Sequence, residues 1–443
     1  MEKNRKLILI AFALFAFVNQ SAFGQGLQID FSEFRLDNGL HVILHQDNST
    51  PNVVVNVMYH VGAKNEEPTL TGFAHFFEHL MFEGSKNIRR GEFTEIVERA
   101  GGTLNAWTSF DLTNFFVLLP SNQLELGLWL ESERMLHPVI DSIGIATQKS
   151  VVTEEMKQTR DNRPYGRILS ETLRRAFLKH PYRSDVLGKD EHVRNATFED
   201  VINFHRTFYV PNNAVLVVSG DIEKETTRAL VEKYFGDIPT GTREITRPTI
   251  VEPRRTAEVR DTVFDNIQIP ALIHAYPLPA LGTKDFYAMD MLSILLTGGQ
   301  SSRLHRQLVD TDQLAMTIQS IPLGLEDPGL KLIFGLPNMG VEIGALEAGL
   351  EKQLDRVRNE LISEREFQKL RNQVESSLVN RNTTIASRAT TLANNHLIFG
   401  DAGRINTEIQ RYMAVTREDI KRVAQKYLKE EYRVVLHYLP KIQ

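Results

Sequence analysis

The sequence of 443 residues contains no cysteine. Disulfide bonds and thiolate metal ligands are therefore excluded, and only histidine and carboxylate side chains remain to hold a transition metal. Long apolar runs are also scarce. Beyond residue 24, no segment comes near the about 18 consecutive apolar residues of a membrane-spanning helix. We therefore expect no membrane span in the mature chain.

One apolar run does occur, at the N-terminus. Residues 7–18 are all apolar, follow three basic residues and precede a stretch that ends in Ala22-Phe23-Gly24. This order is typical of a secretory signal peptide. We expect residues 1–24 to be removed during export and the mature protein to be periplasmic, with secretion to the exterior as the alternative.

Charge and length limit the remaining choices. The net charge is -5, and removal of the signal, with three basic residues and one acidic one, takes it to -7. A mildly acidic chain with dispersed charges argues against nucleic acid as a partner. About 420 mature residues are too many for one core. We expect a first domain at 25–240, a proline- and charge-rich linker at 241–260, and a second domain at 261–443.

A short apolar segment carries three polar side chains. Between residues 73 and 82 every residue is apolar except His75, Glu78 and His79. Thr71 fits the start of a helix and a glycine at 84 fits its end, so the segment is predicted to be a buried helix of about three turns. Residues three and four apart share one helix face, which places the three polar side chains together.

This spacing is typical of a metallopeptidase. Two histidines at i and i+4 can direct neutral imidazole nitrogens at one tetrahedral metal ion, and a glutamate beside them can deprotonate water. The order His-x-x-Glu-His is the inverzincin signature. The alternative is a histidine pair that is hydrogen-bonded to carbonyl groups of the core.

A catalytic zinc needs a third protein ligand, and a carboxylate is the usual choice where cysteine is absent. The predicted helix 145–159 offers Glu154 and Glu155. Glu155 shares a face with Val151 and Val152, which should pack inward, whereas Glu154 lies about 100° away. We predict Glu155 as the ligand and leave Glu154 as the solvated alternative.

The pattern around this motif indicates an α+β fold. An Asn38-Gly39 turn joins two alternating segments, as in a β-hairpin, and further strands are predicted at 53–61, 103–109 and 113–119. Helices lie between them, so the strands should form an antiparallel-rich sheet packed on helices. A pattern at 208–218, a helix end followed by a buried strand, recurs 218 residues later. We therefore expect two homologous domains, which would form half of a clamshell.

The sequence resembles the pitrilysin and insulinase family of zinc peptidases, which includes the mitochondrial processing peptidase and its beta subunit. The resemblance rests on the His75-x-x-Glu78-His79 motif and on Glu155, the second glutamate of a Glu-Glu pair, which lies 76 residues after His79. Three further segments also match the family: Arg35–Leu40, Gly101–Ala106 and His180–Tyr182. It implies one Zn²⁺ per chain, with His75, His79 and Glu155 as ligands and Glu78 as general base.

The resemblance also implies a substrate-binding strand. The family places the strand that contains Asn105 and Ala106 at an open sheet edge, where an extended peptide adds as a further strand. Asn105 would hold a backbone carbonyl of that peptide. One position departs from the family pattern, because many relatives carry an acidic residue where this chain has Gln148. An amide can donate a hydrogen bond there but cannot carry negative charge.

The second domain departs further. The 218-residue offset puts Ser293 and Thr297 where the two histidines stand, so the second copy lacks the metal ligands. The family also places an Arg and a Tyr in this domain that reach the substrate carbonyl, and Val309 and Met316 occupy those positions. We expect a related partner chain to supply the missing donors in a heterodimer. A shifted alignment, with an arginine at 303 or 306 in that role, is the alternative.

We therefore predict a zinc endopeptidase that hydrolyses extended or unfolded peptides. The competing hypothesis is a non-catalytic, chaperone-like scaffold subunit of a peptidase complex. The intact set of His75, Glu78, His79 and Glu155 favours the enzyme.

Overall fold

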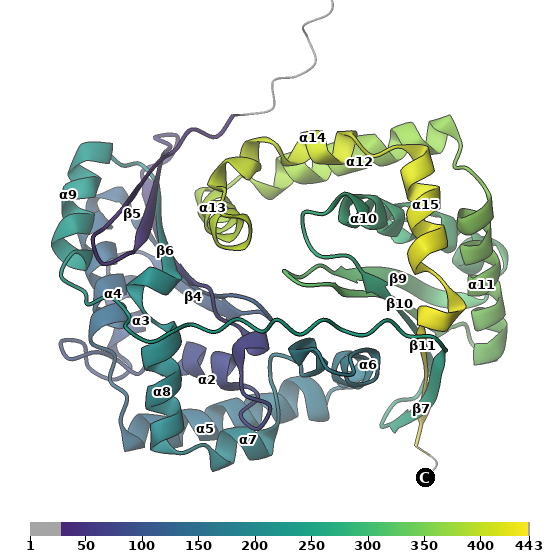
Figure 1. The fold of residues 1–443 in the computed structure, drawn as a ribbon, viewed down its shortest axis with the longest axis horizontal. Coiled ribbons are helices and arrows are strands. Elements are labelled where there is room, and N and C mark those ends of the chain that lie inside the picture. The colour runs from purple at the N-terminus through teal and green to yellow at the C-terminus, as the bar shows by residue number, and fades with distance from the viewer. Residues whose placement is uncertain (1–27, 442–443) are drawn as a thin grey trace, which may run out of the picture.

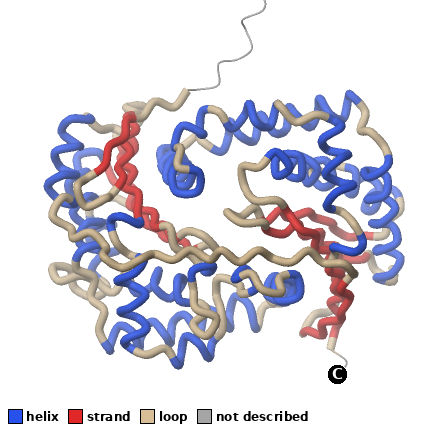
Figure 2. The backbone as a smooth tube through the Cα atoms, viewed as in Figure 1, coloured by secondary structure: helices blue, strands red, loops and turns tan. Residues whose placement is uncertain are grey.

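Two β-sheets lie side by side, each covered by helices (Figure 1). The computed structural model describes residues 28–441, so the predicted signal peptide lies outside the described residues. None of the described helices is long and apolar enough to cross a membrane. The fold class predicted from the sequence, α+β with two similar units of sheet and helices, is confirmed. Figure 2 shows the strands in two separate groups, with an extended loop that runs from one group to the other.

The elements of the first half surround a sheet of six strands. They are β1 (Ser32–Arg35), β2 (His41–Gln46), β3 (Asn52–Tyr59), α2 (Phe73–Leu80), α3 (Glu92–Arg99), β4 (Thr103–Thr108), β5 (Thr113–Pro120), α4 (Leu124–Leu136), α5 (Ser142–Met156), α6 (Ile168–Ala176), α7 (Asp190–Asn195), α8 (Phe198–Phe208), β6 (Ala214–Gly220) and α9 (Lys224–Phe235). Residues 236–258 then form neither helix nor strand.

The elements of the second half surround a sheet of five strands. They are β7 (Val259–Asp265), β8 (Ala271–Leu278), α10 (Lys284–Thr297), β9 (Ala315–Leu323), β10 (Gly329–Pro337), α11 (Ile343–Asn359), α12 (Glu364–Arg381), α13 (Ile385–Phe399), α14 (Glu408–Met413), α15 (Arg417–Tyr427) and β11 (Val434–Pro440).

The two sheets share one topology. The first has the order β1-β2-β6-β3-β5-β4 and the second has the order β7-β11-β8-β10-β9. In each sheet one pair is parallel, β2 with β6 and β7 with β11, and the other pairs are antiparallel. The first sheet has one additional strand, β1, which pairs with β2 across the predicted Asn38-Gly39 turn. Equal strand order with equal strand directions is what an internal duplication produces.

Alternation along the strands gives each sheet two apolar faces. Val55 and Val57 of β3 pack on the side of α2, whereas Val54 and Met58 point to the opposite side. That opposite side is covered by α13 of the second half, through residues such as Leu392. The second sheet is covered in return by α6 of the first half. This exchange of helices joins the two halves.

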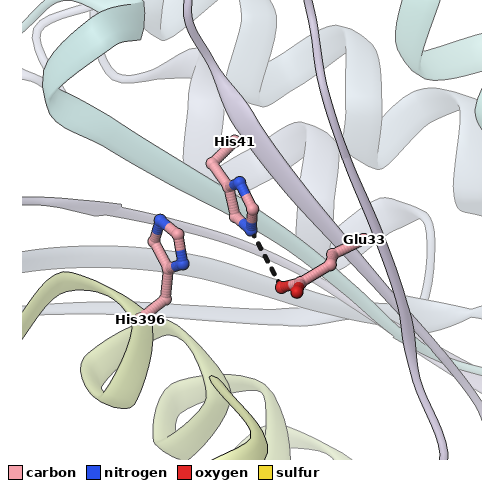
Figure 3. Close-up of side chains that lie close together, drawn as sticks. All are labelled: Glu33, His41 and His396. Carbon is pink, nitrogen blue, oxygen red and sulfur yellow. Dashed lines mark hydrogen bonds and ion pairs between the residues drawn. The ribbon is translucent and has the colours of Figure 1, made fainter. Parts of the chain in front are cut away.

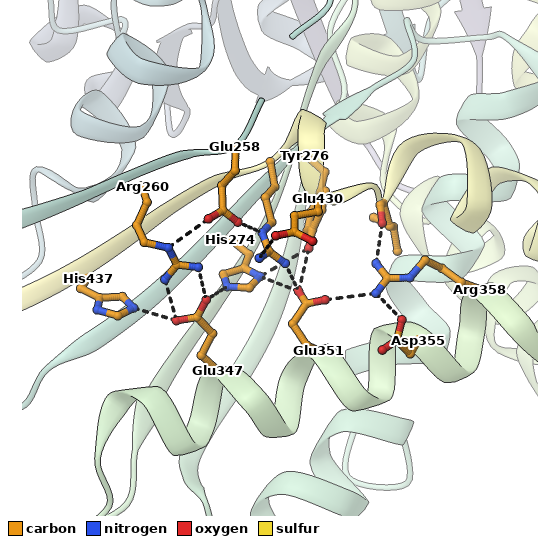
Figure 4. Close-up of polar contacts among 12 residues, drawn as sticks. Glu258, Arg260, His274, Tyr276, Glu347, Glu351, Asp355, Arg358, Glu430 and His437 are labelled. Atoms are coloured by element: carbon orange, nitrogen blue, oxygen red, sulfur yellow. Dashed lines mark hydrogen bonds and ion pairs between the residues drawn. The ribbon is translucent and has the colours of Figure 1, made fainter. Parts of the chain in front are cut away.

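The outer helix α11 is held to the second sheet by charge. Figure 4 shows Glu347 and Glu351 of this helix facing basic side chains of the strands. Arg260 Nη2 lies 2.6 Å from Glu347 Oε1, and His437 Nε2 lies 2.9 Å from Glu347 Oε2. The buried His274 lies between the two glutamates. Burial alone would raise the pKa of Glu351, but hydrogen bonding from His274 and the positive neighbours lower it to about 2.

A buried ammonium group also joins the halves. Lys64, in the segment between β3 and α2, is 3% exposed. Its Nζ lies 2.9 Å from Asp111 Oδ1 of the first half. The same Nζ contacts Glu326 and lies 3.2 Å from Asp327, both in the loop between β9 and β10 of the second half. A buried cation with several carboxylate partners holds these loops in one arrangement.

Candidate metal centre

The helix α2 begins differently from the prediction. Its first residue is Phe73, after Gly72 with a φ of 90°, and the side chain of Thr71 does not cap it. The carboxylate of Glu66 accepts hydrogen bonds from the backbone N–H groups of Gly72 and Ala74, each at 2.8 Å, and satisfies the free amides of the first turn. The expectation that Thr71 caps the helix was wrong, because a carboxylate in the preceding loop takes that place.

The burial of α2 follows its sequence. Four large apolar side chains point into the core of the first half: Phe73, Phe76, Phe77 and Leu80. His75 is 8% exposed, and Glu78 and His79 are half-buried. The polar side chains therefore project from a helix that is packed tightly on its other sides.

The neighbouring helix α5 brings a carboxylate to the two imidazoles. His79 Nε2 lies 3.2 Å from Glu155 Oε2, and His75 Nε2 lies 3.7 Å from the same oxygen. The two imidazole rings are nearly perpendicular, at 83°, with their centroids 4.9 Å apart. One donor atom from each of the three side chains lies within 4.8 Å of the other two. The sequence could identify Glu155 only as inward-facing, and the structure brings it to the histidines.

The protonation states suit a divalent cation. Burial, together with the positive charge that His79 would carry, lowers the pKa of His75 to about 4, although Glu155 opposes this. The pKa of Glu155 is lowered by its hydrogen bond with His79, against the effect of burial. His75 is therefore a neutral imidazole at pH 7 and Glu155 a carboxylate, which are the forms that ligate zinc. The donor set fits a zinc ion.

The alternative carboxylate points elsewhere. Glu154 is exposed, and its Oε2 lies 3.1 Å from Lys157 Nζ. It belongs to no group of converging donors among the residues that the structure describes. A π-helical turn, Lys157–Asp161, follows α5 directly. Such turns are frequent at functional sites.

Glu78 is held by a residue that the sequence did not reveal. Thr108 Oγ1, at the end of β4, donates a hydrogen bond of 2.7 Å to Glu78 Oε2. Burial raises the pKa of Glu78, and the Thr108 hydroxyl acts in the opposite direction. Strand alternation puts Thr108 on the same face as Ala106, but only the packing of β4 beside α2 makes it a partner of Glu78.

The strand β4 is a sheet edge. It pairs with β5 on one side only, with Asn105 opposite Phe116 and Ala106 opposite Phe115. Asn105 is exposed, and its Oδ1 accepts a hydrogen bond of 2.8 Å from the backbone N–H of Ala106. Thr108, at the end of this edge strand, therefore links β4 to Glu78, which lies on the same helix as His75 and His79.

A second carboxylate stands near Gln148. The amide Nε2 of Gln148 donates to Glu83 Oε1 at 2.5 Å, and Arg90 Nε lies 2.7 Å from Glu83 Oε2. Glu83 is 5% exposed and follows α2 by three residues. Gln148 therefore connects α5 to the loop that follows α2. This contact helps to fix the position of one helix relative to the other.

The helix of the second half that corresponds to α2 is α10, which carries Ser293 and Thr297 in place of the two histidines. Lys331 Nζ, fully buried on β10, donates to Ser293 Oγ of α10 and, at 2.6 Å, to Ser320 Oγ of β9. The backbone N–H of Ser320 donates to Thr297 Oγ1 at 2.9 Å. Burial lowers the pKa of Lys331 to about 7, although Asp290 opposes this.

Comparison with known proteins identifies the family. Residues 41–190 match the family model described as "Insulinase (Peptidase family M16)", and residues 195–374 match the one described as "Peptidase M16 inactive domain". The chain is 30% identical over 432 residues to "Zinc protease PqqE" of Helicobacter pylori, with 96% of each chain covered. The chain belongs to peptidase family M16. The predicted membership of the insulinase family is thus confirmed.

Another relative and two solved structures are also similar to this chain. "Uncharacterized zinc protease YmxG" of Bacillus subtilis is 23% identical, with 91% of this chain and 97% of the relative covered. The crystal structure of a protease from Helicobacter pylori matches with a TM-score of 0.88 and 29% identity, and covers 93% of this chain and all of that one. The periplasmic protease PqqL of Escherichia coli shares the fold, with a TM-score of 0.77 and 18% identity. There the match covers 95% of this chain but 48% of PqqL.

Proposed function

We propose that this M16 chain is a zinc-dependent endopeptidase that hydrolyses extended or unfolded peptides. The observation that carries the proposal is the convergence of His75, His79 and Glu155, with donor atoms within 4.8 Å of one another. Glu78 lies on the same helix and its carboxylate is fixed by Thr108. The relatives named zinc proteases make zinc the metal to expect.

Each side chain has a separate task. His75, His79 and Glu155 hold the zinc ion, and zinc, when bound, supplies Lewis-acid chemistry that polarises a peptide carbonyl and acidifies water. Glu78 accepts the proton of the attacking water and then delivers it to the nitrogen of the leaving amine. Its half-buried position keeps the carboxylate close to the reacting atoms. The hydrogen bond from Thr108 fixes the carboxylate oxygen that does not take the proton.

The substrate adds to the edge of the first sheet. An extended peptide beside β4 finds a row of backbone groups that β5 does not use. The Nδ2 amide group of Asn105 then donates a hydrogen bond to a substrate carbonyl, while its Oδ1 still accepts from the backbone N–H of Ala106. A folded protein offers no free backbone for this pairing, so unstructured peptides are the substrate class.

A related partner chain completes the site. Val309 and Met316 can donate no hydrogen bond to a developing oxyanion, and Met316 is 51% exposed. Of the two alternative donors, Arg303 is engaged, because its Nε and Nη2 each donate to Glu366 at 2.9 Å. Arg306 is exposed and remains the alternative to a partner chain. PqqL is about twice as long as this chain, as the 48% coverage shows, and this length supports a working unit of two such pieces. Here a separate, non-catalytic chain takes the place of the second half of a protein of the length of PqqL. The two chains close as a clamshell.

The remaining assignments belong to the same proposal. Residues 25–240 form the zinc-binding domain, 241–260 the linker, and 261–443 the homologous domain without metal ligands. The signal peptide directs the chain to the periplasm, and the periplasmic location of the structural neighbour PqqL supports this assignment. The alternative of a non-catalytic scaffold has support in the match of residues 195–374 to the inactive-domain model, but that match lies outside the histidine motif.

The test combines metal analysis with a cleavage assay. Purified chain should contain about one tightly bound zinc at this cluster. An unstructured peptide of roughly ten to a few tens of residues should be cut, and a stably folded protein should not. The assay is run with this chain alone and after co-expression with a related chain encoded beside it. Full activity without a partner would refute the heterodimer but leave the endopeptidase standing, whereas no cleavage in any arm would favour the scaffold.

A further inference from the structure

A second group of two imidazoles and one carboxylate lies between the two halves (Figure 3). Glu33 comes from β1, His41 from β2 and His396 from α13 of the second half. Each side chain offers one ligand atom, and these atoms lie within 4.8 Å of one another. In residues 28–441 this is the one such group besides the cluster at His75.

The contacts within this group are short. His41 Nε2 lies 3.1 Å from Glu33 Oε2, and the side chains of His41 and Glu33 are 13% and 47% exposed. The rings of His41 and His396 are stacked, with centroids 3.6 Å apart and planes within 8° of parallel. The group therefore has a half-buried imidazole side and an open carboxylate side, through which an ion and water can enter.

Both imidazoles are held in the neutral form. Burial lowers the pKa of His41, and Arg35 acts in the same direction against the carboxylate of Glu33. Burial and the neighbouring His41 lower the pKa of His396 to about 4. Two stacked imidazoles that resist protonation lose no proton when they ligate a metal near pH 7. The nearby carboxylate supplies the negative charge that a divalent cation needs.

We infer that Glu33, His41 and His396 bind a zinc ion that joins α13 to the edge of the first sheet. Two imidazoles with one carboxylate suit Zn²⁺, whereas Mg²⁺ and Ca²⁺ prefer oxygen ligands alone. Because lone pairs lie in the ring planes, parallel rings do not aim at one point. Coordination would therefore require the His396 ring to turn out of the stack, and the open side of Glu33 would leave room for water.

The ion has a structural role. The helix α13 packs on β3 and β6 through apolar side chains, and at its start Arg388 pairs with Asp47. His396 stands near the other end of the same helix. A metal bond there adds a further polar connection between α13 and the first sheet, so the ion stabilises the folded chain without touching the reacting atoms.

The test is a Co²⁺ titration of metal-stripped full-length protein, followed by visible absorption. Wild-type protein should bind two equivalents and His396→Gln one. In a His75→Ala/His79→Ala background, one equivalent should remain, and Zn²⁺ should raise the Tm of that variant. Adding Glu33→Gln or His396→Gln should weaken this binding by more than the about 10–100-fold typical of an outer-shell partner. These readouts require no peptidase activity, so they stand apart from the proposed function.

His45→Gln is the matched control. His45 lies on the same strand as His41 and also meets α13, with its Nε2 3.4 Å from Arg388 Nη1. This variant should keep the second equivalent. Unchanged Co²⁺ affinity after Glu33→Gln and His396→Gln, or no bound equivalent in the His75→Ala/His79→Ala variant, would overturn the inference and leave the stacked pair as a packing contact. Equal loss in His45→Gln would also contradict it, since loosening of α13 would then explain the effect.

Discussion

The two halves place different side chains where a buried helix faces the outermost strand of a sheet. In the first half, α2 and β4 meet through Glu78 and Thr108, next to two histidines. In the second half, α10 and β9 meet through Thr297 and the backbone of Ser320. The strand order is the same in both sheets. The common architecture therefore leaves the chemistry of this position free to differ.

Each half also satisfies its buried polar groups differently. The cluster of His75, His79 and Glu155 gathers one ligand atom from each of three side chains, which a single divalent cation can satisfy together. The second half carries its own amine, since Lys331 donates to the hydroxyls of Ser293 and Ser320. Under the proposed function the first arrangement takes up an ion from outside, whereas the second satisfies its polar groups with its own amine. The predictions below test this difference.

The largest effect should come from Glu78→Gln. The amide keeps the size of the carboxylate but cannot accept a proton, so peptide cleavage should fall by about 10²–10⁴-fold or more. Zinc content, measured by elemental analysis, should stay at the wild-type value because Glu78 is not a ligand. Loss of zinc in this variant would contradict the separation of base from ligands.

The next effect separates the two adjacent carboxylates of α5. Glu155→Ala should lose the zinc at this cluster together with activity, and a strong chelator should reproduce both losses in the wild type. Glu154→Ala removes an exposed side chain paired with Lys157 and should change neither. If Glu154→Ala strips the metal and Glu155→Ala does not, our choice of ligand is wrong.

The sequence could predict what depends on local spacing. The shared face of the i, i+4 histidines follows from helical geometry, and the Asn38-Gly39 hairpin follows from its turn residues. The inward face expected for Glu155 is confirmed for Val152, which is buried, but was wrong for Val151, which is 43% exposed. The sequence could not predict contacts between distant segments. Glu66 replaces Thr71 at the start of α2 because a loop folds back, and Thr108 reaches Glu78 because two elements 30 positions apart are packed together.

The sequence also could not predict that each sheet is covered by a helix of the opposite half. An apolar helix face such as that of α13 shows that the helix packs on something, but not on which sheet. The exchange of α6 and α13 became visible only in the structure.

A smaller effect should follow from Thr108→Val. The variant keeps the shape of the side chain and removes the hydrogen bond to Glu78, so the carboxylate loses its fixed orientation. We expect a loss of about tenfold in kcat, in line with one hydrogen bond to a charged group. Thr108→Ser should restore most of it, with zinc content unchanged throughout. Equal losses in both variants would indicate a packing defect in β4 instead.

The smallest effect, on stability alone, concerns Lys331→Met in the second half. The pKa of this buried amine is lowered from 10.5 to about 7. Between these values the unfolded chain holds a proton that the folded chain has released, so this group makes the folded chain more stable as pH rises. Below about pH 7 both states are protonated, and the full penalty for a buried charge is present.

Methionine removes this penalty and fills a similar volume. The free energy of unfolding of Lys331→Met, relative to the wild type, should therefore be highest at pH 6 and should fall towards pH 10, by on the order of a few kcal/mol. Denaturant titrations at several pH values measure this difference, from which the groups common to both proteins cancel. Peptide cleavage at a permissive temperature should not change, because Lys331 belongs to the half without the metal cluster. A pH-independent difference would show that the amine is charged in the folded chain, and the second half would then resemble the first in holding a buried cation.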